Sequence, residues 1–329
     1  MTEESPKPKR LPRGKRKPVS LNGRRPAIEA GRAAKVHVFS NSEVDRLVTA
    51  LMRSDRSYER RLVLDLLYRY VALTEETLFR LVHEQVAISD NPRCFNAQLS
   101  RYRKDGLIAD LPSVAVRRAL RAGLPEPTSG RMRAYCLGPV GEAYVVRKGW
   151  NGNAPSPSLT EEHLVHDLVC AETMLQMQTL WANLPTDRRG VVEIRGPRQV
   201  AVWDSEKKAY LAAPDGLLIK HTPQGVFERA FVVEYHNTNS ILNVQQKIKR
   251  YEELAKEQYD WLWNDHWGLN HMPIVLVLYR QQANYQHYMD ELSQRATLRA
   301  MYAATSLEAI WAGNLTLKVL YRPSTEDTE

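Results

Sequence analysis

Two carboxylates in the second half of the chain have the setting of a candidate metal site. Asp215 precedes the apolar run LLI, and Glu234 follows the apolar run FVV. The turn-forming residues 222–225 lie between the two runs, which predicts a β-hairpin. Adjacent strands lie about 5 Å apart, so acids at their ends can share one divalent cation. Such an Mg²⁺ ion would lower the pKa of a bound water, so the pattern favours hydrolytic chemistry.

Two further side chains near this pair could act on an attacking water. His236 follows Glu234 by two residues, and Lys220 lies on the neighbouring predicted strand. Either group could orient or deprotonate the water. Without either one in place, the domain would be a binding platform.

The same carboxylates also have a purely structural interpretation. Asp215 could cap a turn, and Glu234 could form an ion pair with Lys247 or Arg250 of the following helix. The sequence leaves the catalytic and structural interpretations open.

The elements around the hairpin predict an α/β domain with a mixed sheet. Apolar spacing predicts helices before and after the hairpin, and the continuous apolar run MPIVLVLYR predicts a strand buried on both faces. The predicted order is a helix over 160–181, a strand within 190–203, the hairpin, a helix over 241–258, a strand over 272–280, a helix over 284–299, and a last short helix and strand.

The first half of the chain has the pattern of a winged helix-turn-helix. Three short predicted helices are followed by two extended segments, with residues 116–130 as the loop between them. The third helix, 93–104, would be the recognition helix. Its polar side chains are Arg93, Asn96, Gln98, Arg101, Arg103 and Lys104.

Arg, Asn and Gln can make paired hydrogen bonds to base edges in the major groove. We expect Gln98 and Arg101 to contact bases and Arg103 and Lys104 to contact phosphates. Arg131 and Arg133, in the second wing strand, would approach the minor groove or the backbone of double-stranded DNA. The alternative is a helical module that is basic for solubility or that binds protein.

Positive charge is concentrated in two segments of the 329-residue chain. Residues 1–36 hold eleven Lys/Arg against three acids, and residues 91–148 hold eleven against four. Phosphate backbones are common partners of such patches. The predicted organisation is a disordered basic arm (1–36), a winged helix-turn-helix domain (37–150), a linker (151–160), an α/β domain (161–323) and a disordered tail (324–329).

Several other classes of protein lack support. No apolar run is long enough for a membrane helix, and three isolated cysteines fit a reducing cytoplasm. No phosphate-binding GxxxxGK[ST] or hydrolase GxSxG pattern occurs. The tryptophans at 261, 263 and 267 could stack bases or dock a partner, although such spacing is typical of a core cluster.

The order of elements in the second half resembles the PD-(D/E)XK nuclease-like fold. The resemblance implies that Pro214-Asp215 and Glu234 hold Mg²⁺. It expects lysine two residues after the Glu, where this chain has His236. The supporting side chains that the resemblance implies are His166 and Glu172 of the first helix, and Gln246, Lys247, Arg250 and Tyr251 of the helix after the hairpin.

The chain as a whole resembles the replication-relaxation proteins of plasmids and mobile elements, over most of residues 58–315. The segments that carry this resemblance are CLGPVGEAYV, His166-Asp167, PDGLLI, FVVEYHNTN, KIKRYEEL, MPIVLVLY and SLEAIWAG. The resemblance implies DNA binding in replication, mobilisation or transcriptional control. That family usually has an acid where His236 stands, so cleavage is left open.

Three functions therefore follow as hypotheses. The first is a cytoplasmic DNA-binding protein whose partners would include replication or conjugation proteins. The second is a Mg²⁺-dependent endonuclease targeted by its winged helix. The third is an adaptor whose tryptophan-rich face docks a partner protein.

Overall fold

The computed structural model describes most of the chain. The described residues are 39–53, 58–86, 91–127, 132–150, 160–185, 189–204, 206, 208–236, 241–294 and 300–322. The predicted arm, all but the last residue of the predicted linker, the predicted tail and Arg131 lie outside these ranges. The described chain is a mixed α/β structure, which confirms the predicted class.

The first half combines six helices with a small sheet among its described residues. Its elements are α1 (Asn41–Arg53), α2 (Tyr58–Tyr70), β1 (Ala72–Thr74), α3 (Glu75–Gln85), α4 (Pro92–Lys104), β2 (Ile108–Asp110), α5 (Ser113–Arg121), β3 (Ala134–Leu137) and α6 (Pro139–Arg147). The three strands are antiparallel in the order β1-β3-β2.

Local signals in the sequence determine where the helices of this half begin. Thr74 caps α3 by accepting a hydrogen bond from the backbone of Thr77, and Asn91 caps α4 by accepting one from Arg93. Pro92 occupies the first turn of α4, where its missing N–H costs nothing. The helix predicted over 93–104 therefore begins within one residue of its predicted start.

The predicted loop over residues 116–130 is wrong in part, because α5 includes its first six residues, 116–121. Ala115, Val116 and Ala119 are buried on one face of this helix, and α5 packs against α7 (Glu161–Ala182) of the second half. The packing surface on α7 is distant in sequence, so the short apolar stripe on its own did not distinguish α5 from a loop.

The second half is built around a six-stranded sheet. After α7 come β4 (Val191–Arg195), α8 (Pro197–Val200), β5 (Val202–Asp204), β6 (Ala209–Ala212), β7 (Gly216–His221), β8 (Phe227–His236), α9 (Ile241–Leu254), a 3₁₀ turn (Glu257–Tyr259), a π-helical turn (Leu262–His266), β9 (Ile274–Tyr279), α10 (Gln282–Ser293), β10 (Tyr302–Ser306), α11 (Leu307–Trp311) and β11 (Lys318–Tyr321).

The strand order is β11-β10-β9-β8-β7-β4, with β8, β9 and β10 parallel and the remaining pairs antiparallel. The predicted mixed sheet is thus confirmed. Strand β10 was not expected, and the single strand expected within 190–203 is instead β4, α8 and β5. Gly196 lies at this break, where only glycine fits because a Cβ would lie 1.8 Å from the carbonyl oxygen of Arg69.

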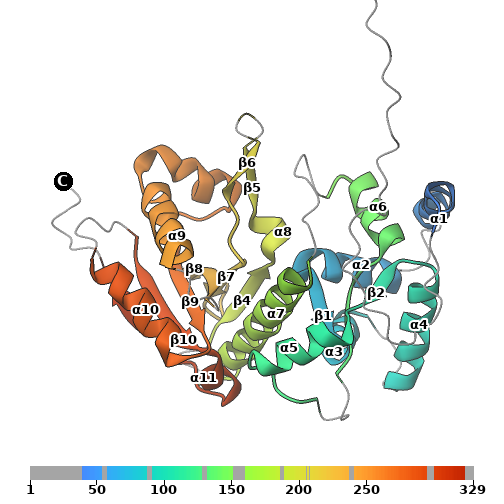
Figure 1. Ribbon diagram of the computed structural model, residues 1–329, viewed down its shortest axis with the longest axis horizontal. Coiled ribbons are helices and arrows are strands. Elements are labelled where there is room, and N and C mark those ends of the chain that lie inside the picture. The colour runs from blue at the N-terminus through green and yellow to red at the C-terminus, as the bar shows by residue number, and fades with distance from the viewer. Residues whose placement is uncertain are drawn as a thin grey trace, which may run out of the picture.

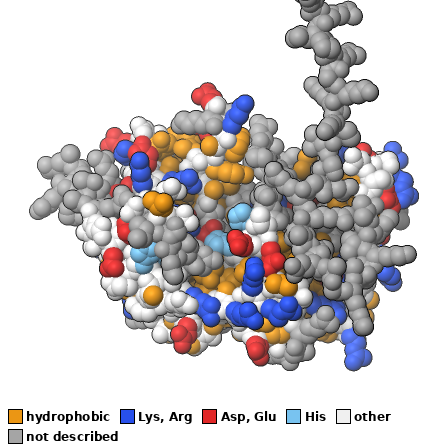
Figure 2. Space-filling view, in the orientation of Figure 1, with side chains coloured by type: hydrophobic (Ala, Val, Ile, Leu, Met, Phe, Trp, Pro, Cys, Tyr) orange, Lys and Arg blue, Asp and Glu red, His pale blue; other side chains and the backbone are white. Residues whose placement is uncertain are grey.

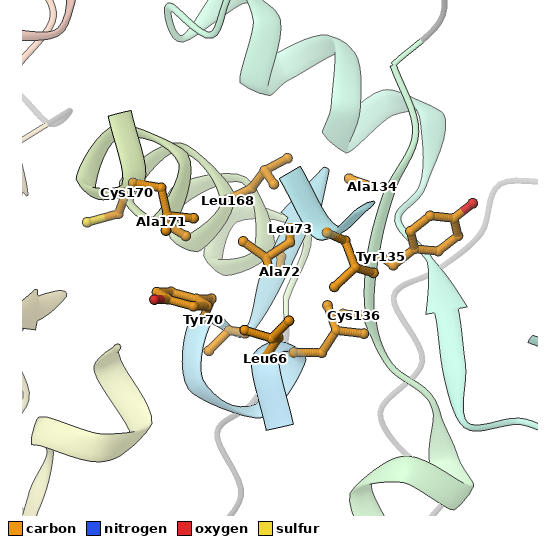
Figure 3. Packing of buried hydrophobic residues seen from close by; sticks show 14 of the residues in the cluster. Leu66, Tyr70, Ala72, Leu73, Ala134, Tyr135, Cys136, Leu168, Cys170 and Ala171 are labelled. Carbon is orange, nitrogen blue, oxygen red and sulfur yellow. The ribbon is translucent and has the colours of Figure 1, made fainter. Parts of the chain in front are cut away.

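Helices cover both faces of the sheet, as Figure 1 shows: α7 lies on one side, between the sheet and the first half, and α9 and α10 lie on the other. One hydrophobic cluster includes α2, β1, β3, α7 and the adjoining sheet face. Figure 3 shows Leu73 of β1 close to Leu168 of α7, and β1 and α7 are in contact. The two halves therefore share a hydrophobic core through α7.

No helix among the described residues combines the length and the apolar character needed to cross a membrane.

Candidate functional site

The β7–β8 hairpin brings the two predicted carboxylates together at the same end of these two adjacent strands. Asp215 lies just before β7, and its backbone N–H donates to the carbonyl of Val233 (3.1 Å). Its side chain accepts from the backbone N–H of Tyr235 (2.7 Å). Asp215 is therefore held between the two residues that flank Glu234, and the two carboxylates are electrostatically coupled.

Glu234 is almost fully buried, with 4 % of its surface exposed, and α9 provides both of its partners. Lys247 donates to Oε2, and the Tyr251 hydroxyl donates to Oε1. Burial raises the pKa of Glu234, and Lys247 opposes this rise by stabilising the charged carboxylate. The Glu234–Lys247 ion pair that the sequence left as an alternative is present.

Lys247 is the counter-cation of the carboxylate pair. Burial lowers the pKa of Lys247. The negative charges of Glu234 and Asp215 raise it by more, so the resulting pKa lies above the ordinary lysine value. The ammonium is therefore charged at neutral pH.

A second cation faces Asp215 from α7. His166 Nε2 lies 3.4 Å from Asp215 Oδ2, and Nδ1 lies 3.5 Å from Asp167 Oδ1. Burial alone would lower the pKa of His166, but Asp215 and Asp167 raise it to about 9. His166 is consequently an imidazolium near neutral pH and pairs with Asp215 as a cation.

His236 lies beneath the site rather than in it. It is 1 % exposed, and its ring lies 5.4 Å from that of Tyr288. Burial, Lys247 and His287 lower the pKa of His236 to about 4, so the imidazole is neutral at pH 7. Its Nε2 has no hydrogen-bond partner among the described residues. The sequence predicts that His236 contacts an attacking water. The buried position of His236, outside the pocket lining, does not provide this contact.

Two sequence-based expectations on supporting residues are wrong. Lys220 lies five residues along the strand from Asp215, about 16 Å at the usual rise, and its ammonium pairs with Glu228 (2.8 Å). Glu172 faces the first half, where it accepts from the backbone of Thr74 (2.8 Å) and the hydroxyl of Thr77 (2.6 Å). Glu172 therefore anchors the start of α3 and does not reach Asp215.

A pocket of about 750 Å³ opens over Asp215. Figure 2 shows a hollow in this face, with acidic and histidine side chains in it and basic side chains along its α5 side. The pocket is lined by Arg118, Glu162, His163, Val165, His166, Asp167, Asp215, Tyr235, Asn243, Gln246, Lys247 and Arg250. Of the predicted α9 residues, Gln246, Lys247 and Arg250 line it, whereas Tyr251 is buried below.

Sequence reasoning did not identify Arg118 as a residue of this site. It reaches the pocket from α5, in the segment expected to be a loop, and pairs with Glu161 at the start of α7 (3.0 Å). The signal that could have identified it is the apolar spacing of Ala115, Val116 and Ala119, which puts Arg118 on the opposite face of a helix.

The pair of carboxylates does not fit Mg²⁺ as they are arranged. Both oxygens of Glu234 are engaged by Lys247 and Tyr251, and Asp215 is engaged by His166 and the Tyr235 backbone. Among the residues with described positions, no three His, Cys, Asp or Glu side chains gather as metal ligands. Lys247 would have to leave Glu234 before a divalent cation could bind both acids.

The predicted recognition helix exposes part of its polar set. Arg93, Arg101 and Lys104 are exposed on α4, whereas Arg103 pairs with Asp110 of β2 (2.6 Å). Asn96 is partly buried. The exposed face of α4 is therefore basic, and Arg103 is tied to the neighbouring strand.

Two residues that were predicted to contact DNA instead interact with acidic side chains of neighbouring helices. With its amide oriented to satisfy both groups, Gln98 donates to Glu59 of α2 (2.8 Å). Arg133 lies 3.7 Å from Glu75, which also accepts from the Tyr135 hydroxyl. These interactions oppose the base contact expected of Gln98 and the backbone contact expected of Arg133.

The tryptophan-rich segment is mainly core. Trp263 and Trp267 are buried, and the Trp267 indole donates to the carbonyl of Val200 (3.1 Å). Of the three, Trp261 alone is exposed. The tryptophan-rich docking face that the adaptor hypothesis needs is therefore not formed.

Comparison of the chain with protein-family models, with curated proteins and with solved structures finds no match in any of the three.

Proposed function

We propose that the protein binds double-stranded DNA through a winged helix-turn-helix first half, and that its second half is a PD-(D/E)XK nuclease-like domain. The observation that carries the proposal is the exposed basic face of α4, which follows α3 in a three-helix arrangement backed by the β1-β3-β2 sheet. The segments that resemble motifs of replication-relaxation proteins favour a role in replication, mobilisation or transcriptional control of a plasmid or mobile element.

The charge on α4 supports DNA as the partner. Arg93 lies near the start of the helix, and Arg101 and Lys104 lie in its last turns, all three exposed. Arginine offers a planar set of donors that matches both guanine edges and phosphate oxygens. Residues that read bases would come from this face rather than from Gln98.

Replacing Arg101 and Lys104 together by Gln should weaken duplex binding about tenfold or more at moderate salt. Each lost phosphate contact should also reduce the slope of log affinity against log salt by about 0.9. Fluorescence anisotropy with a labelled duplex at several salt concentrations measures both quantities.

The matched control removes two exposed basic charges from α1, as Arg46→Gln with Arg53→Gln. It should retain wild-type affinity. If the α4 variant and the α1 variant bind duplex DNA equally well, α4 is not the recognition helix. A wild-type protein that does not bind DNA would overturn the proposed function itself.

A second candidate function is a Mg²⁺-dependent endonuclease, in which Lys247 would leave Glu234 when the ion binds, and one specific observation favours it. Lys247 lies against Glu234 and is electrostatically coupled to Asp215, so α9 supplies the lysine that the strand lacks at His236. Two acids and one lysine therefore meet at a pocket whose lining also carries Arg118 and Arg250. This set of groups is the one expected of phosphodiester hydrolysis by a PD-(D/E)XK domain.

If the endonuclease proposal is correct, wild-type protein should nick supercoiled plasmid in the presence of Mg²⁺, and Asp215→Asn and Glu234→Gln should each abolish nicking. Glu228→Gln, an exposed position on the same hairpin, is the control and should retain activity. Agarose gel electrophoresis separates the forms. No nicking by wild type would make the domain a binding platform, and nicking by Asp215→Asn would show a contaminating nuclease.

A further inference from the structure

A second, smaller pocket lies beside the one over Asp215 and is strongly basic. It has a volume of about 360 Å³ and is lined by Arg118, Arg121, Arg280 and Asn284, among others. No carboxylate is among the described side chains that line it. The pocket therefore concentrates positive charge and is suited to an anionic ligand.

Two elements far apart in sequence hold these arginines. Arg118 and Arg121 lie three residues apart on the exposed face of α5, whose buried face packs on α7. Arg280 follows the buried strand β9, at the carboxyl end of the parallel strands. Their backbones are thus fixed by buried packing. The Arg118 guanidinium pairs with Glu161 of α7 (3.0 Å), whereas Arg121 and Arg280 are exposed.

The pocket also has an unsatisfied polar group in its wall. Asn284 is 4 % exposed and donates to the carbonyl of His236 (3.4 Å), but its Oδ1 has no hydrogen-bond partner among the described residues. A buried acceptor of this kind favours a ligand that brings a donor as well as anionic oxygens. A nucleic-acid strand has both, in its phosphates and in the amino groups of its bases.

The two pockets form a continuous path. Arg118 and Tyr235 line both of them, and the backbone N–H of Tyr235 is bonded to Asp215. The phosphate charge of a strand that passes along the arginines is neutralised before the strand reaches Asp215. The α5 helix, in the place where a wing loop would lie, thus contributes to the second-half site.

We propose that Arg118, Arg121 and Arg280 bind the phosphodiester backbone of a single DNA strand and direct it into the pocket over Asp215. The inference rests on the proposed function, and assigns to it a second DNA-binding surface distinct from α4. Arginine suits this role because its planar donors bind phosphate oxygens in pairs.

The test compares the double variant Arg121→Gln with Arg280→Gln against Arg117→Gln, in the full-length chain. Arg117 is exposed on the same helix but does not line either described pocket. The double variant should bind a labelled single-stranded oligonucleotide three- to tenfold more weakly, with a salt slope smaller by about 1.4. The Arg117 variant should retain a slope within about half a unit of wild type, which is less than one phosphate contact.

Two further measurements make each outcome decisive. Duplex binding through α4 should be retained in the double variant, and its thermal melting temperature should match wild type because both side chains are exposed. Equal single-strand affinity and slope in the double variant and wild type would overturn the inference while duplex binding still supports the proposed function. If inorganic phosphate stabilises wild type but not the double variant, with oligonucleotide affinity unchanged, the pocket binds a free anion and the strand assignment is wrong.

Discussion

Replacing Lys247 by Met should lower the free energy of unfolding by about 2–3 kcal/mol at pH 7. The change leaves Glu234 buried without its counter-cation, and loss of one partner of a buried pair costs roughly 3–5 kcal/mol. We expect less here because a third of the Lys247 side chain is exposed. Urea unfolding followed by tryptophan fluorescence measures the difference.

The loss caused by this substitution should shrink as the pH falls. Burial already raises the pKa of Glu234, and removal of Lys247 raises it further. A carboxyl group with a raised pKa binds more protons in the folded state than in the unfolded state, so acidification stabilises the fold. The Lys247→Met variant should therefore recover part of its stability, relative to wild type, between pH 7 and pH 5.

Lys249→Met is the matched control on the same helix. Lys249 is exposed, so its replacement should change stability by no more than about 0.5 kcal/mol at either pH. Equal stability of the Lys247 variant and the Lys249 variant would mean that Lys247 does not compensate the buried charge of Glu234. A loss that does not change with pH would mean that Glu234 is not the group left unpaired.

The second large effect is expected at the contact between the two halves. Arg198 of α8 is almost fully buried, forms two hydrogen bonds to Glu142 of α6 (2.7 and 3.3 Å), and lies over the Tyr68 ring at 5.5 Å. Replacing Arg198 by Ala should cost about 3–4 kcal/mol, because it leaves Glu142 unpaired and removes a cation–π contact.

Two comparisons make the Arg198 prediction specific. Arg198→Lys keeps the charge but not the paired hydrogen bonds, so its loss should be intermediate. Arg229→Ala removes an exposed arginine and should be nearly neutral. Urea unfolding gives the stabilities, and limited proteolysis of Arg198→Ala should cut between the halves faster than in wild type. Wild-type stability in Arg198→Ala would show that this contact does not hold the halves together.

The sequence by itself determined most elements and the location of the site. Apolar spacing placed α7 and α9, the run MPIVLVLYR gave the fully buried β9, and turn residues 222–225 gave the hairpin. These features depend on neighbours within a few residues, so they are visible as local patterns. The hairpin was enough to bring Asp215 beside Glu234, because register follows from the turn.

Only the tertiary structure decided which side chains reach the carboxylates. Lys247 pairs with Glu234. Lys220 lies near the far end of β7 from Asp215 and pairs with Glu228. Glu172 faces α3, since the opposite side of α7 meets the site. His236 is neutral because α10 buries it. Each outcome depends on packing between segments distant in sequence, and no local pattern encodes such a neighbour.

The α5 helix shows the same limit most clearly. Its residues lie mostly in a segment that the sequence predicted to be a loop, yet three small apolar side chains dock it on α7. That contact gives a short helix the burial it needs to be stable and directs Arg118 to both pockets. The sequence supplied the arginine, and long-range packing determined where it lies.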